Sequence, residues 1–312
     1  MHAATRSVRI RRTARLVRQN IGVYLLLLPA LTLVILFAYK PMYGVIIAFK
    51  NYKSSLGILG SPWADPPYKF FLQFFNSYQF NTTVSNTLVI SFYSLLAGFP
   101  FPILVALGLN QMQAKTFKRV YQTISYLPHF ISTVVMVGLI LILLSPSSGL
   151  LGNLYRIFDR TAPNLMGSKN AFSSIYVWSD IWQHTGWNSI IYFATLSTID
   201  PTLYEAATVD GANRWQKIRH IDMPMLLPTA SILLILSAGN IMNVGFEKVY
   251  LMQNNLNLNV SEVLSTYTYK IGIQHQQYSY SSAINLFNTL VNLALLITVN
   301  QFSKRFSENS LW

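Results

Sequence analysis

The chain has 312 residues, of which 52% are hydrophobic and only 11% are charged, and its formal net charge is +13. Because soluble domains carry roughly 25% charged residues, this composition predicts an integral membrane protein. Cysteine is absent, which excludes disulfides and thiolate metal sites, and the five histidines are scattered without metal-ligand spacing. The lipid bilayer is therefore the first expected partner, and we expect no metal and no nucleic acid.

Six stretches of the chain are apolar and uncharged enough to cross a bilayer, which takes about 20 apolar residues. They are centred near residues 30, 96, 133, 187, 235 and 292. The first follows a basic segment, but it is too long for a signal-peptide core and no small-x-small site follows it, so we expect an uncleaved anchor. The expected fold class is all-α, with a six-helix membrane domain over residues 21–303.

Lysine and arginine predict the orientation of these helices. If the N-terminus is cytoplasmic, 14 cations lie in the 67 residues of the inner segments, which are 1–20, 110–121, 198–223 and 304–312. Eight cations lie in the 96 residues of the outer segments, which are 50–81, 145–172 and 246–281. The positive-inside rule thus favours both termini in the cytoplasm. For the basic segment 1–20, an interfacial helix on anionic headgroups and a disordered tail both fit.

The inner segment 198–223 is long and charged for a connection between two spans, and it contains "EAATVDGANRWQKIRHIDMPMLLP", residues 205–228. Asp200 as N-cap and Pro201 at the first helical position predict a helix start. Gly211 interrupts this helix and can take a positive φ. A second helix is expected over residues 212–221, with Trp215, Ile218 and Ile221 on one face, before Pro224 begins the fifth span. A docking element and an amphipathic helix at the headgroups both fit this form.

The stretch resembles the EAA motif of ABC importer permeases, Glu-Ala-Ala-x-x-Asp-Gly-Ala followed by Ile-x-x-Pro. The matching residues are Glu205, Ala206, Ala207, Asp210, Gly211, Ala212, Ile221 and Pro224. In that family the motif forms a coupling helix that sits in a cleft of a cytoplasmic ATPase. The resemblance implies a type I ABC importer permease fold in which Arg214 and Lys217 add polar contacts at the cleft.

Other stretches resemble the oligosaccharide branch of the carbohydrate-uptake (maltose-type) permeases. They are "YLLLLPALTLVILFAYKPMYGVIIAFKNYK" from residue 24, "GSPW" from 60, "NTLVISFYSLLAGFPFPILVALGLNQ" from 86 and "ISYLPHFIS" from 124. Members of this branch import oligosaccharides and polysaccharide fragments, alginate-type and pectin-type chains among them. The implied assembly pairs two permeases, often as a heterodimer, with an ATPase dimer and an extracytoplasmic solute-binding protein in the bacterial cytoplasmic (inner) membrane.

The chain has no Walker loop and no catalytic motif. We therefore expect a transport subunit and not an enzyme, with ATP and magnesium held by the separate ATPase. An ion-coupled secondary transporter would need more ionisable residues within the spans, and a membrane enzyme would need a cluster of catalytic groups.

Polar and aromatic residues within the spans are candidates for a sugar pathway, because sugars need groups that both donate and accept hydrogen bonds and pack on aromatic rings. In the fifth span these candidates share one helical face, and they are Ser237, Asn240, Asn243 and Glu247. The aromatic candidates are Tyr93, Trp178, Trp182 and Tyr192. Maltose-type permeases similarly line their sugar site with polar residues of this span. Helix–helix hydrogen bonding at a dimer interface and an interfacial aromatic belt fit the same residues.

Three further features have two interpretations each. Asp180 in the fourth span can bind a sugar hydroxyl or pair with Lys169, and we favour the pair. The prolines of "GFPFP" at residues 98–102 can line a pathway or form a static kink. The outer segments can dock a binding protein or act as lids, and their eight cations against four acids suit an acidic oligosaccharide.

Overall fold

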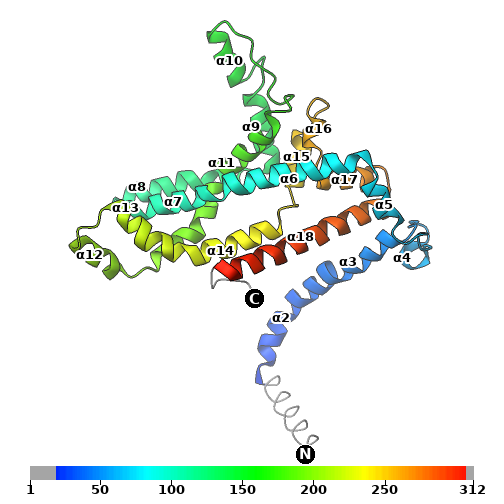
Figure 1. The fold of residues 1–312 in the computed structure, drawn as a ribbon, viewed down its shortest axis with the longest axis horizontal. Helices are drawn as coiled ribbons and strands as arrows, with labels where there is room; N and C mark the ends of the chain where they lie inside the picture. Colours follow the sequence, from blue (N-terminus) through cyan, green and yellow to red (C-terminus); the bar gives the residue numbers. More distant parts are fainter. Residues whose placement is uncertain (1–18, 307–312) are drawn as a thin grey trace, which may run out of the picture. The chain divides into compact units, whose positions relative to one another are not determined.

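The computed structural model describes residues 19–306 and divides into two compact units, residues 1–70 and 71–312 (Figure 1). Each unit is helical, and the described residues contain no β-strand beyond an isolated bridge between Lys50 and Trp63. The basic segment 1–18 and the tail 307–312 lie outside the described residues, so the expectations for them stay predictions.

The first unit consists of one apolar helical stretch and a short loop. The stretch begins with α2 (Ile21–Val34) and continues through η1 (Ile35–Tyr39), α3 (Lys40–Met42) and η2 (Tyr43–Phe49). Its apolar side chains are exposed along α2. The loop carries α4 (Gly57–Gly60), and the Nζ of Lys50 donates to the carbonyl oxygens of Ile58 and Leu59 at 2.8 and 3.1 Å. An exposed helix of this composition is suited to lipid.

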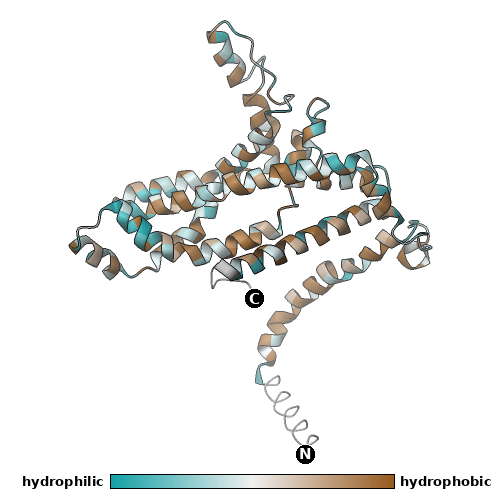
Figure 2. Cartoon of the chain, in the orientation of Figure 1, coloured by the Kyte–Doolittle hydropathy of each residue, from teal (hydrophilic) through white to brown (hydrophobic). Residues whose placement is uncertain are grey.

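The second unit, after α5 (Lys69–Phe75) at the boundary, is a bundle around one long helix. That helix, α11 (Phe172–Ser197), packs against α6 (Tyr78–Gly98), α7 (Pro100–Gln111), α8 (Lys115–Tyr126) and α14 (Met223–Gly239). α14 packs in turn against α18 (Tyr278–Phe306). Hydrophobic residues dominate α14 and α18, and hydrophilic residues gather at α13 (Arg214–Lys217) (Figure 2).

The remaining helices are short and connect these long ones. They are η3 (Leu127–Phe130), α9 (Thr133–Leu143), α10 (Leu150–Ile157), α12 (Pro201–Val209), η4 (Ile218–Asp222), α15 (Phe246–Met252), α16 (Leu258–Ser261), α17 (Leu264–Tyr269) and η5 (Lys270–Gln274).

The all-α fold class is confirmed, and five of the six predicted spans coincide with a long helical stretch, while the third falls on two helices. Four stretches of the described residues are long and apolar enough to span a membrane: Ile21–Phe49, Tyr78–Gln111, Arg214–Gly239 and Tyr278–Lys304. A fifth is added if Lys115–Phe130 and Thr133–Leu143, which meet at 97°, count as one. The 26 residues of α11 reach about 39 Å at 1.5 Å per residue. That length suffices for a span, but its polar residues lower its hydropathy.

Two predicted helix boundaries are wrong. The third span is not one helix, because the chain leaves the helix after Phe130, and Ser132 caps α9 by accepting from the Val135 N–H. Pro224 does not begin the fifth span, because the helix runs without a break from Arg214 to Gly239. The wider π turn of η4 directly precedes this proline and accommodates its missing N–H.

Candidate functional site

The EAA stretch forms a corner between two helices. The Asp200 side chain caps α12 by accepting from the Thr202 N–H at 2.9 Å, with Pro201 in the first turn, as predicted. The helix ends at Asp210, and Gly211 follows with a φ of +77°. Only glycine takes this left-handed conformation without strain, so the predicted role of Gly211 as the bend is confirmed.

Side-chain hydrogen bonds fix the angle of this corner. Asn213 and Gln216 form a reciprocal capping box at the start of α13, with N···O distances of 2.7 and 3.0 Å. The Lys217 Nζ donates to the Thr208 hydroxyl at 2.7 Å and joins α13 to α12. The corner is therefore a preformed element, and Asn213 is a cap that sequence reasoning missed although its spacing to Gln216 signals one.

The motif residues present a mixed surface at this corner. Glu205, Asp210 and Arg214 are exposed. Val209 is 88% exposed and Trp215 is 79% exposed. Ile218 and Ile221 pack on a buried cluster that includes Leu196 and Leu226, whereas Trp215 does not take part in this packing. Ala206 and Pro224 are also exposed, and Ala207 is half-buried, so apolar and charged groups lie together on the exposed surface of the corner.

A cavity of about 940 Å³ lies between α6, α7, α11 and α14. Four of the predicted pathway residues line it: Tyr192, Ser237, Asn240 and Asn243. Gly98, Phe99 and Pro102 line the cavity as well. The "GFPFP" stretch therefore borders the cavity, and the helical stretch Tyr78–Gln111 continues through these prolines. The cavity is at the upper end of the size range of small-molecule pockets.

The predicted helical face of the fifth span is wrong at its outer end. α14 ends at Gly239, and residues 240–245 are an irregular segment before α15. Asn240 and Asn243 still line the cavity because this segment turns along it, but Glu247 lies in α15, is exposed, and is not among the lining residues. The Asn243 Oδ1 also accepts from Asn288 and Asn292 of α18 at 3.0 and 3.3 Å.

Of the aromatic residues predicted for the pathway, one lines the cavity and three do not. Tyr93, Trp178 and Trp182 do not line the cavity. The Trp178 Nε1 donates to the Tyr93 hydroxyl at 2.9 Å, and the two tryptophans are about half exposed. Trp187, which sequence reasoning missed, does line it and stacks on His129 with ring centroids 4.4 Å apart and planes within 4°.

His184 is another lining residue that sequence reasoning missed. Asp180, His184 and Trp187 are spaced i, i+4 and i+7 on α11, so helical periodicity puts them on one face. All three line the cavity. His184 Nδ1 lies 3.4 Å from the Asp180 carboxylate. This periodicity was the signal that could have identified them.

The predicted pair between Asp180 and Lys169 is wrong. The partner is Lys248 of α15, whose Nζ lies 3.2 Å from the carboxylate and also donates to the Tyr176 carbonyl at 3.1 Å. Lys248 is only 5% exposed, and its ammonium lies 4.8 Å from the centre of the Tyr176 ring. The two groups are 68 positions apart in the sequence, so residue spacing alone does not reveal the pair.

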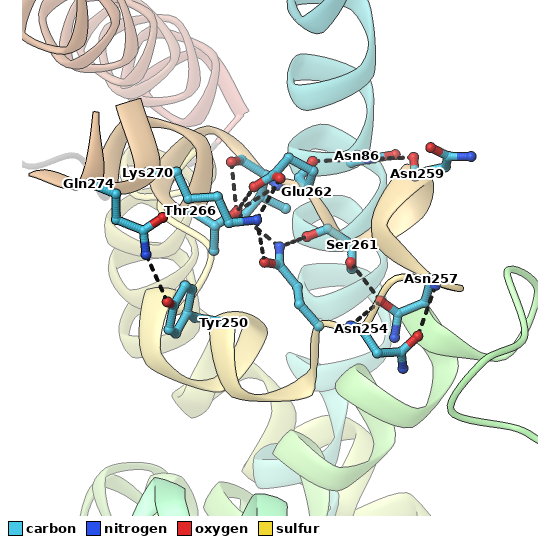
Figure 3. Close-up of polar contacts among 12 residues, drawn as sticks. Asn86, Tyr250, Asn254, Asn257, Asn259, Ser261, Glu262, Thr266, Lys270 and Gln274 are labelled. Atoms are coloured by element: carbon cyan, nitrogen blue, oxygen red, sulfur yellow. Dashed lines mark hydrogen bonds and ion pairs between the residues drawn. The ribbon is translucent and has the colours of Figure 1, made fainter. Parts of the chain in front are cut away.

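The segment 246–281, expected as an outer loop, is an ordered helical region (Figure 3). Glu262 accepts from Lys270 at 2.7 Å and from the Thr266 hydroxyl at 2.7 Å. Its carbonyl accepts from Asn86 of α6 at 2.9 Å. The two lysines of this segment, Lys248 and Lys270, are thus each paired with a carboxylate. Their charges therefore give little support to the expectation that the outer segments attract an acidic oligosaccharide.

Comparisons with known proteins agree with this arrangement. Residues 98–308 match the family model described as "Binding-protein-dependent transport system inner membrane component". The chain is 39% identical over 289 residues to the polygalacturonan/rhamnogalacturonan transport system permease protein YteP of Bacillus subtilis (strain 168), covering 93% of this chain and 89% of that protein. It is 37% identical to protein LplB of the same organism, covering 93% and 90%.

Solved structures give the same relationship. The chain resembles one in the crystal structure of a bacterial alginate ABC transporter in complex with alginate pentasaccharide-bound periplasmic protein. The TM-score is 0.86 at 37% identity, with 95% of this chain and 99% of that chain covered. A second alginate-importer structure matches with a TM-score of 0.87 at 38% identity. A secondary transporter and a membrane enzyme do not fit this relationship. The chain therefore belongs to the binding-protein-dependent transport system inner membrane component family, whose members are membrane permease subunits.

Proposed function

We propose that this chain is one of two permease subunits of an ATP-driven importer that carries acidic oligosaccharides across the bacterial cytoplasmic membrane. The observation that carries the proposal is a cavity of about 940 Å³ bordered by an indole, an imidazole, hydroxyls and amides. Aromatic faces and two-way hydrogen-bonding groups are what a sugar needs. The names of the relatives refer to polygalacturonan and alginate, which are chains of uronic acids.

The partners follow from the same relationship. A second permease, in a heterodimer, completes the cavity, and a solute-binding protein delivers the sugar to the outer segments. The corner of α12 and α13 docks in the cleft of an ATPase dimer, through Glu205, Asp210, Arg214 and Lys217 at its polar surface. Val209 and Trp215 supply exposed apolar surface there. ATP and magnesium bind the ATPase, and ATP drives transport through its different affinity for the two conformations.

The test is ATP hydrolysis by the purified complex in lipid with its binding protein. Oligosaccharides of uronic acids are compared with neutral oligosaccharides of the same length. We expect the uronic-acid chains to stimulate hydrolysis and to accumulate inside proteoliposomes. Stimulation by neutral sugars alone would refute the acidic substrate, and failure of an ATPase subunit to co-purify would refute the importer.

Docking at the corner has its own test, because the chain has no cysteine of its own. A Val209→Cys variant is expected to form a cross-link with an ATPase subunit that carries a cysteine in its cleft. Leu104→Cys, which places an exposed cysteine on α7, is the control and is expected to form none. Equal cross-linking at the two positions would refute docking at the corner.

A further inference from the structure

A buried carboxylate lies directly behind the corner. Asp222 ends η4, between α13 and α14, and its side chain is 0% exposed. In the motif Ile-x-x-Pro this position is unspecified, so the resemblance assigns it no role. Burying a carboxylate costs several kcal/mol unless hydrogen bonds satisfy it, so its partners decide what it does.

The three partners of Asp222 are neutral and come from two other helices. Gln111 Nε2 donates to Oδ2 at 2.9 Å, and Asn110 Nδ2 donates to Oδ1 at 3.2 Å. The Tyr204 hydroxyl donates to the same Oδ1. Asn110 Nδ2 also donates to the Tyr204 hydroxyl at 3.1 Å, which closes the network. We call these four residues the Asp222 joint.

The joint connects the helix of the corner with two helices that line the cavity. Tyr204 belongs to α12, the coupling helix, while Asn110 and Gln111 are the last residues of α7. Asp222 itself precedes α14 in one continuous helix. Both α7 and α14 line the cavity, through Pro102 of the first and Ser237 of the second. The joint is therefore a direct polar connection from the coupling helix to two walls of the cavity.

The carboxylate of the joint is buried, and its three partners, Asn110, Gln111 and Tyr204, are half-buried. Tyr204 packs on the buried cluster of Ala106, Leu107 and Leu226. Burial, together with the hydrogen bond to the carboxylate, raises the pKa of Tyr204 to about 12, so the phenol keeps the proton that it donates. Hydrogen bonds to a charged acceptor in a low-dielectric site are stronger and more specific in geometry than apolar contacts, so α12 cannot slide on α7 without breaking them.

We propose that Asp222 is a positioning residue that makes α12 move as one body with the ends of α7 and α14, so that displacement of the coupling helix reopens the cavity. This rests on the proposed docking of α12 to an ATPase. Without the joint, the ATPase would still bind and still hydrolyse ATP, but less of the movement would reach the cavity.

The test compares Tyr204→Phe, which removes the phenol donor and keeps the ring, with the control Tyr121→Phe, which removes a half-exposed hydroxyl from α8. Uptake and ATP hydrolysis are measured on equal amounts of assembled complex. Allosteric couplings typically span about 5- to 150-fold, and we expect sugar imported per ATP to fall at least about fivefold in Tyr204→Phe and to stay at the wild-type ratio in Tyr121→Phe. A wild-type ratio in Tyr204→Phe would overturn the proposal.

A second variant and a distance measurement separate transmission from simple stability. Asp222→Asn combined with Tyr204→Phe should uncouple no more than the stronger single variant, because both break one network. With spin labels on Thr202→Cys and Gln113→Cys, the wild-type distance should be the same with and without ATP, and it should change with ATP in Tyr204→Phe. Additive losses of sugar imported per ATP in the double variant, or an equal ATP-dependent change of the label distance in the wild type, would overturn the proposed role of the joint. If the wild-type complex imports no sugar when it hydrolyses ATP, this result refutes the proposed function itself and not the role of the joint.

Discussion

The close packing of α11 on α8 gives a prediction whose size follows from the structure. A Cβ at Gly186 would lie 2.0 Å from the Ser125 carbonyl oxygen and 2.4 Å from its carbonyl carbon. Since Cβ contacts under 3.0 Å are essentially never found, Gly186→Ala must part the two backbones by about 1 Å. Overpacking of this kind costs about 1–3 kcal/mol.

The matched control is Gly108→Ala in α7, where a Cβ would meet nothing within 4 Å. Replacing a helical glycine by alanine otherwise stabilises by about 0.5–1 kcal/mol, so we expect the two variants to differ by about 1.5–4 kcal/mol in unfolding free energy. Thermal unfolding of the purified protein in detergent measures this difference. Gly186→Ala should also reduce uptake, because its neighbours Thr185 and Trp187 line the cavity. Equal stability of the two variants would refute the described contact between α11 and α8.

Substitutions at four other positions test the cavity and the corner. Asn243→Ala should lower stability by about 1–3 kcal/mol because two asparagine amides of α18 lose their acceptor, whereas Asn240→Ala should leave thermal stability unchanged and reduce uptake. Asp180→Ala removes the carboxylate from the buried Lys248 and should cost about 2 kcal/mol in thermal unfolding, less than a fully buried pair, because the Asp180 side chain is 42% exposed. Gly211→Asn should retain more ATP-coupled uptake than Gly211→Val, because asparagine tolerates a positive φ and a β-branched residue does not.

The corner could be predicted from the sequence because each of its parts follows from a rule about neighbouring residues. An aspartate before a proline starts a helix, and a glycine after the last turn ends it. These rules involve residues within four positions of one another, so no knowledge of the fold is needed. The same locality explains the error at Pro224, since the sequence does not show that a π turn will carry the helix past a proline.

The groups that sequence reasoning missed depend on contacts between distant parts of the chain. Lys248 and Asp180 are 68 positions apart, and Gln111 and Asp222 are 111 positions apart. Hydropathy places each segment in or near the membrane, but it does not say which helices touch. His184 and Trp187 are different, because the helical period already places them on one face with Asp180. The sequence does not show that this face borders a cavity.

Hydrogen bonds within the chain divide the polar residues of the fifth span into two groups. Asn243 is an acceptor for α18, so using its oxygen for a sugar would break hydrogen bonds that hold the helix pair. Asn240 Nδ2 donates to the Leu236 carbonyl at 3.1 Å, and its Oδ1 accepts from Asn243 Nδ2 at 3.4 Å, so among the described residues its side chain makes no hydrogen bond to another helix. In the proposed importer, we therefore expect sugar recognition to depend on Asn240 and Ser237 together with the face of α11 that bears His184 and Trp187. Asn243 serves the packing of α14 on α18 from the same cavity wall.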